Sequence, residues 1–117
     1  SPPMDIDCEI NGENKMLKTH MNNAYLLHVQ DREEGRVEQL ADILFGEVLI
    51  DETCRYKKGF RVMTSPVIYS HDNEFKTSNG SLYIAERATE SLTISASEWY
   101  VMREHLLSPH ELLSLRK

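Results

Sequence analysis

The chain has only two cysteines, four prolines and five glycines among its 117 residues, and no long uninterrupted apolar segment. A structural zinc site would need two further ligands from scattered histidines. Cys8 and Cys54 could form a single disulfide, but without a secretion signal we expect them to be reduced thiols. No apolar run approaches the roughly 20 residues that cross a bilayer, and the N-terminus lacks the basic start and apolar core of a secretory signal. We therefore expect a cytoplasmic protein with no membrane partner, metal or cofactor.

Known catalytic and nucleotide-binding motifs are also missing. The sequence has no G-x-x-x-x-G-K-[ST] or G-x-G-x-x-G loop and no G-x-S-x-G turn around a serine. Ser70, His71 and Asp72 are the residue types of a hydrolytic triad, but neighbouring side chains point apart and cannot converge on one atom. The histidines lack the spacing of a zinc pair on one helix. We assign no catalytic residue and no metal ligand.

One short segment combines a thiol, cations and aromatic rings. It runs through Cys54, Arg55, Tyr56, Lys57, Lys58, Phe60 and Arg61. The cations could lower the pKa of the Cys54 thiol, and the interleaved rings resemble a small platform for single-stranded nucleic acid. Only four cations contribute, however, in a molecule of net charge −6. An inert thiol beside a solvated turn is the favoured interpretation.

Charge is unevenly distributed along the chain. Residues 1–54 hold twelve acidic and four basic residues, a formal charge of −8, whereas residues 55–117 carry +2. An acidic surface repels nucleic acid and anionic membranes, and it attracts basic proteins. The charge therefore predicts a basic protein partner and no direct nucleic-acid partner.

The first part of the chain predicts a mobile segment followed by helix. Residues 1–14 are polar and acidic, and we expect them to be mobile, with a single α+β domain over residues 15–117. Apolar residues at helical spacing favour a short helical segment from Lys15 that leads into a strand over Tyr25–Val29, although alternation fits this stretch equally well.

An amphipathic helix is predicted next. Asp31 precedes Glu34 by three residues, the spacing of a capping box. An apolar stripe at i, i+3, i+4 and i+7 then follows at Val37, Leu40, Ala41 and Leu44. Gly46 is placed to end this helix.

The remaining chain predicts strands and then helices. Alternating segments bounded by turn residues lie at 47–51, 60–64, 67–70, 75–77, 81–85 and 92–94. Capping-box spacings at Ser95/Glu98 and Ser108/Glu111 predict two helix starts. The predicted fold is α+β, an antiparallel meander of about five strands with an amphipathic helix before it and one or two helices after it.

An acidic face is the strongest functional signal. We expect Asp31, Glu33, Glu34, Glu38 and Asp42 to form a partner-binding face on the predicted helix. Carboxylate-rich surfaces block basic surfaces of nucleic-acid-acting enzymes, as in inhibitors of the immunity or phage anti-defence type. The favoured hypothesis is such a non-enzymatic inhibitor.

Two alternatives remain. One is a small enzyme in which scattered groups such as Cys54, His71 and Tyr83 converge. The other is a homo-oligomeric regulatory or structural protein that pairs through apolar surfaces around Trp99, Leu106 and Leu112.

Overall fold

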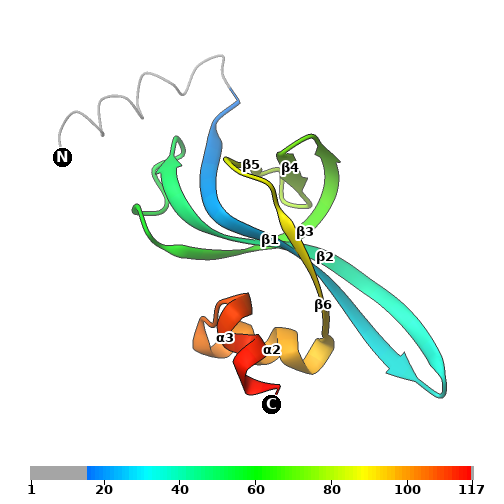
Figure 1. The fold of residues 1–117 in the computed structure, drawn as a ribbon. Helices are drawn as coiled ribbons and strands as arrows, with labels where there is room; N and C mark the ends of the chain where they lie inside the picture. The colour runs from blue at the N-terminus through cyan, green and yellow to red at the C-terminus, as the bar shows by residue number, and fades with distance from the viewer. Residues whose placement is uncertain (1–15, 117) are drawn as a thin grey trace.

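The computed structural model describes residues 16–116. Within them the chain forms strands followed by two helices (Figure 1). The strands are β1 (Lys18–Glu33), β2 (Arg36–Asp51), β3 (Arg61–His71), β4 (Glu74–Thr77), β5 (Leu82–Ala85) and β6 (Glu90–Ser95). The helices are α2 (Ala96–His105) and α3 (Pro109–Leu115). The mobile segment predicted over residues 1–14 lies outside the described residues.

The strands close into a ring. Consecutive strands from β1 to β5 pair antiparallel, as a meander predicts. β5 and then β6 also pair with β1, and both pairings are parallel. Five strands that alternate in direction leave the first and last pointing the same way, so closing the ring makes their contact parallel. The sheet is therefore mixed, and the prediction of a purely antiparallel sheet is wrong.

No helix precedes the sheet in residues 16–116, so both early helical predictions are wrong. The segment predicted as a helix from Asp31 to Gly46 is instead the turn of a β1–β2 hairpin and most of β2. Glu34 and Gly35 both have positive φ, which is the backbone of a two-residue type I′ turn. The residues of β2 from Ile43 to Gly46 are all buried. Burial on both faces gives a strand a continuous apolar sequence, and this hid its period of two.

Gly46 serves packing rather than helix termination. A Cβ added at Gly46 would lie 2.8 Å from the Sδ and 2.9 Å from the Cβ of Met21. Real Cβ atoms do not come so close to a neighbouring chain. The missing side chain therefore lets β1 and β2 cross closely inside the ring.

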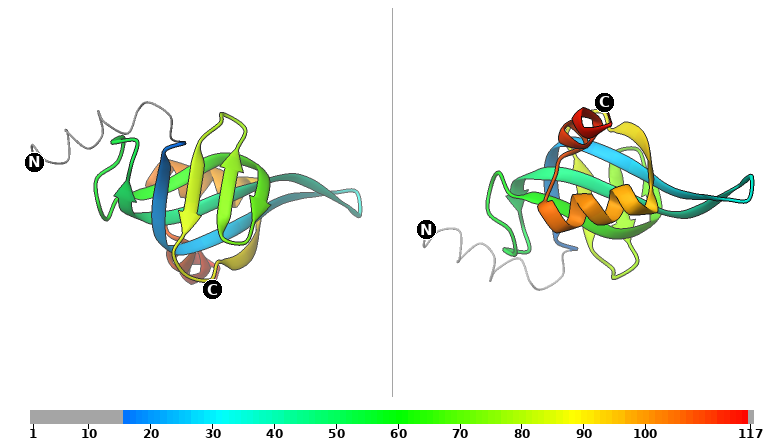
Figure 2. Two further views of the ribbon diagram at one scale, coloured as in Figure 1. Left: turned by 90° about the horizontal axis from the view of Figure 1, so that it is seen from above. Right: turned by 90° about the horizontal axis from the view of Figure 1, so that it is seen from below.

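The hydrophobic core has two parts, one on each side of the sheet. The interior of the ring is filled by Met21, Ala24, Leu44, Val48, Val62, Phe75, Tyr83 and Ala85. The second part lies between the outer face and the helices, and contains Leu27, Val29, Ile43, Phe45, Ile94, Met102 and Leu112. The two helices lie behind the strands when the molecule is seen from above and in front of them when it is seen from below (Figure 2). The alternation of β2 supplies both, since Leu44 points inward and its neighbours point towards the helices.

The two C-terminal helices form where the sequence predicts them. Both capping boxes are present, at Ser95 with Glu98 and at Ser108 with Glu111. Arg61 fixes the junction between the helices, because its Nη1 donates to the carbonyl of Leu106 and to Glu111 Oε1, each at 2.9 Å. Neither helix is long and apolar enough to cross a membrane.

Candidate functional site

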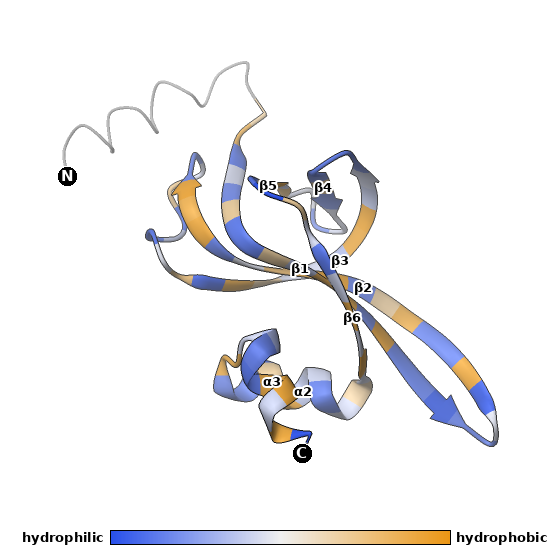
Figure 3. Cartoon of the chain, viewed as in Figure 1, coloured by the Kyte–Doolittle hydropathy of each residue, from blue (hydrophilic) through white to orange (hydrophobic). Residues whose placement is uncertain are grey.

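The β1–β2 hairpin extends well beyond the ring as an arm, defined here as residues 31–40. All ten of these residues are exposed. The arm projects away from the body in each view (Figures 1 and 2). Its residues are mainly hydrophilic, with apolar ones between them (Figure 3). Exposed residues add little to the stability of a fold, so a role in binding is a natural explanation for the arm.

Four of the five acidic residues predicted to bind a partner lie on this arm. Asp31 faces Glu38, Glu33 faces Arg36, and Glu34 is in the turn. Cross-strand neighbours share one face, so Asp31, Glu33 and Glu38 form an acidic face with one cation among them.

Asp42 is separate from the other four acidic residues. It lies in the body of the hairpin opposite His28, whose Nδ1 is 2.8 Å from its Oδ1. Because successive side chains alternate, this pair is on the opposite face of the hairpin from Asp31. The five residues therefore share one hairpin but not one face, and the predicted helical face does not exist.

The pairing of Asp31 with Glu38 is electrostatically unfavourable. Carboxylates directly opposite each other in an antiparallel ladder repel and destabilise the pair. Residues 31–40 hold four acids against two bases, so the arm is net negative. A basic surface laid on this face would relieve the repulsion.

The basic and aromatic segment is a compact loop between β2 and β3. The rings of Tyr56 and Phe60 stack with centroids 5.6 Å apart, and the Arg55 guanidinium lies 5.0 Å from the centre of the Tyr56 ring. Tyr56 is thus partly covered within the loop and less available to stack on a base. The geometry favours the interpretation of this segment as a structural loop.

The groups considered for a hidden active site have other roles. Cys54 is disulfide-bonded, so the prediction of a free thiol is wrong for this residue, while Cys8 lies outside the described residues. Tyr83 is buried in the ring, and burial raises the pKa of its hydroxyl. His71 lies at an exposed turn, 3.4 Å from the Asp72 carboxylate. Among residues 16–116, no hydrogen bond joins a serine hydroxyl to a histidine.

The apolar residues suggested for a symmetric interface are largely used inside the molecule. Leu112 is buried, and Trp99 packs against the core beneath the helices. Leu106 remains exposed. These residues do not form one open apolar surface.

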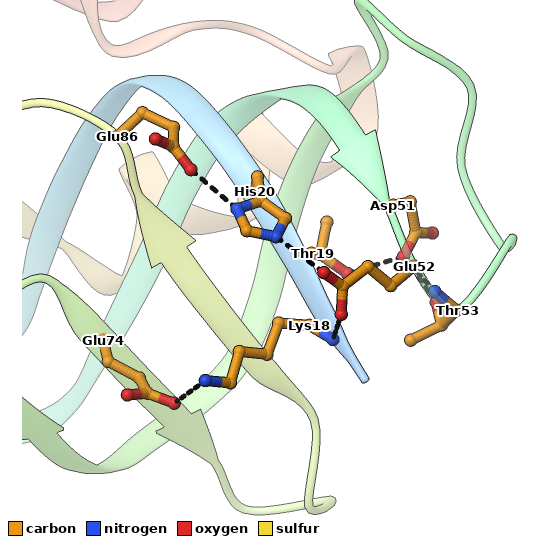
Figure 4. A network of polar contacts seen from close by, with 8 residues as sticks. All are labelled: Lys18, Thr19, His20, Asp51, Glu52, Thr53, Glu74 and Glu86. Carbon is orange, nitrogen blue, oxygen red and sulfur yellow. Dashed lines mark hydrogen bonds and ion pairs between the residues drawn. The ribbon is translucent and has the colours of Figure 1, made fainter. Parts of the chain in front are cut away.

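His20 is held between two carboxylates near the start of β1 (Figure 4). Its Nδ1 lies 2.6 Å from Glu86 Oε2, and its Nε2 lies 3.1 Å from Glu52 Oε2. Burial alone would lower the pKa of His20, but the hydrogen bonds to Glu86 and Glu52 outweigh it and raise the pKa above 6.5. Lys18, two residues before His20 in the chain, is paired with Glu74 at 3.2 Å. As an imidazolium, His20 ties the end of β2 to the chain after β5.

We expect this clasp to make stability depend on pH. The pKa of His20 is higher in the folded state, so its contribution is fully present below the unfolded pKa of about 6.5 and is lost as the pH rises through the folded pKa. Urea unfolding from pH 5.5 to 8.5 should therefore show the native chain losing stability relative to His20→Gln. Parallel curves for the two proteins would contradict the clasp.

Sequence reasoning missed the arm because the arm is the end of a β-hairpin, and this stretch was predicted to be a helix. The local signal of a hairpin turn was Gly35, which follows Glu34. The helical interpretation placed this glycine in the first turn of the predicted helix. Comparisons of this chain with family models, curated proteins and solved structures found no match.

Proposed function

We propose that this chain is a non-enzymatic binding protein whose acidic arm docks on a basic surface of a partner protein. The observation that carries the proposal is an exposed arm with an unfavourable Asp31–Glu38 pair near its base. The partner class we propose is a nucleic-acid-acting enzyme, with the chain acting as an inhibitor of the immunity or phage anti-defence type. Such enzymes carry cationic surfaces for phosphates, and a carboxylate-rich arm competes for them and is steered towards them.

Glu38→Lys separates binding from folding. The substitution converts the repulsive pair with Asp31 into an attractive one, so the free energy of unfolding should rise by about 0.2–1 kcal/mol. Binding should weaken at the same time, because a cation now faces the basic partner. Chemical denaturation measures the first effect.

Affinity capture from a lysate of the source organism, quantified by mass spectrometry, measures the effect of Glu38→Lys on binding. The native chain and Glu104→Lys, an equal charge change on exposed α2, should recover the same basic protein, and Glu38→Lys should not. Equal recovery by all three would exclude the arm as the binding surface.

A further inference from the structure

We propose that the arm binds by strand addition, in which an extended segment of the partner pairs with the open edge of β2 over residues 36–39. The inference rests on the proposed function and specifies how the partner is held. Strand addition requires free backbone N–H and C=O groups on the edge of β2. It also requires that no side chain blocks pairing and that the side chains nearby favour a basic strand.

The free backbone groups follow from the turn. In a two-residue type I′ hairpin the flanking residues, Glu33 and Arg36, form a hydrogen-bonded pair. Hydrogen-bonded and non-hydrogen-bonded pairs then alternate along the ladder, so Arg32 with Val37 and Gln30 with Gln39 are of the second kind. The N–H and C=O groups of Val37 and Gln39 therefore point away from β1.

No neighbouring strand of the described residues uses these groups. The pairing of β3 with β2 ends where Pro66 lies opposite Ile43, and proline has no N–H to continue a ladder. The bulge at Leu40 bends the chain there and separates residues 36–39 from the body. The edge of β1 is shorter, since β6 pairs along it as far as Gln30 and α2 begins next to that point.

The edge of β2 lacks two of the devices that natural edge strands use against pairing. Residues 36–39 contain neither proline nor lysine, and their charged side chains, Arg36 and Glu38, restrict pairing to an occupant whose charges match. Val37 is 47% exposed, so a neighbouring strand would cover an apolar side chain. The edge is open to a partner whose charge matches.

The charges select the occupant. A strand added beside β2 places every second side chain on the face of Glu38 and Asp31, and the others on the face of Val37. The favoured segment therefore alternates basic residues with apolar ones. A second copy of this chain would place Glu38 near another carboxylate and is disfavoured for that reason.

The test uses a short peptide of alternating valine and lysine as the probe, with the full chain. Residue-resolved hydrogen exchange should show the amides of Val37 and Gln39 slowing by about tenfold or more when the peptide is present, with little change at Arg36 and Glu38. The matched control is the same peptide with N-methyl groups on all of its backbone amides, which keeps its charge and cannot donate to a ladder. It should give no protection.

Binding of the peptide without protection at Val37 and Gln39, or equal binding of the N-methylated peptide, would overturn strand addition and leave electrostatic docking of the arm intact. Absence of binding by either peptide would also overturn strand addition. The capture experiment with Glu38→Lys tests the proposed function separately, so the two failures are distinguishable.

Discussion

Asp51→Ala should destabilise the fold by about 3–5 kcal/mol, because five donors lose their acceptor and each buried donor left unsatisfied costs about 1–3 kcal/mol. The Asp51 carboxylate is buried at the end of β2 and organises the loop that follows. Its Oδ1 accepts from the hydroxyls of Thr19 at 2.8 Å and Thr53 at 2.6 Å, and from the Thr53 amide at 3.0 Å. Its Oδ2 accepts from the amides of Arg55 and Tyr56, both at 2.8 Å. Alanine would leave these donors without an acceptor.

The measurement is urea unfolding at neutral pH, with Asp31→Ala on the arm as the matched control. The control should change the free energy of unfolding by no more than about 0.5 kcal/mol, because that carboxylate is exposed. Thr19→Val removes a single donor and should cost about 1 kcal/mol. If Asp51→Ala cost no more than Asp31→Ala, the carboxylate would not be organising the loop.

Acid should reproduce part of this loss. Burial alone would raise the pKa of Asp51, but hydrogen bonds from Thr53, Thr19 and the loop amides hold it below its usual value. Its contribution is therefore present above the unfolded pKa of about 3.9 and is lost as the pH falls through the folded pKa. Asp51→Ala should show a weaker loss of stability over that acid range than the native chain.

Shortening the arm should abolish partner binding and leave the fold almost unchanged. The variant deletes Arg32, Glu33, Arg36 and Val37, so that residues 31 and 38 flank the turn. Two rungs are removed because the pair next to a two-residue turn must be hydrogen-bonded. The substitutions Asp31→Thr, Glu34→Asn and Glu38→Thr then neutralise the short hairpin and give it a favoured Asn-Gly turn.

Each removed side chain is exposed, so the free energy of unfolding should change by no more than about 1 kcal/mol. Capture of the basic partner should fall to background. Retained capture would show that another surface binds. A large loss of stability would show that the arm is part of the folding unit.

The sequence predicted those elements whose signals are local. The starts of α2 and α3 were predictable because each capping box is satisfied within four residues, at Ser95 and Ser108. β4 and β5 were predictable from alternation on either side of the Asn79-Gly80 turn. These signals depend on neighbours along the chain and not on distant packing.

The early half of the chain failed for a physical reason. Arm residues are exposed on both faces and body residues of β2 are buried on both, so neither part shows a period of two. Val37, Leu40 and Leu44 then matched helical spacing by coincidence. The parallel contact of β1 with β5 and β6 depends on closure of the whole ring, which no local pattern encodes.

The acidic residues of the candidate site were identifiable from charge alone, but their arrangement was not. Asp31 and Glu38 were expected on one helical face, and they face each other across a ladder instead. The cytoplasmic location stays a prediction. The disulfide at Cys54 favours an oxidising compartment, because such bonds are rare in the cytosol.

Site-specific photocrosslinking tests the binding role of the arm most directly. A photoreactive phenylalanine derivative replaces Val37 on the arm or, as a control, Tyr100 on α2; both native side chains are exposed. Illumination in a lysate of the source organism should join a basic protein to the Val37 variant, and adding Glu38→Lys should remove that adduct. Adducts from Tyr100 alone, or a Val37 adduct that survives Glu38→Lys, would contradict binding through the acidic arm.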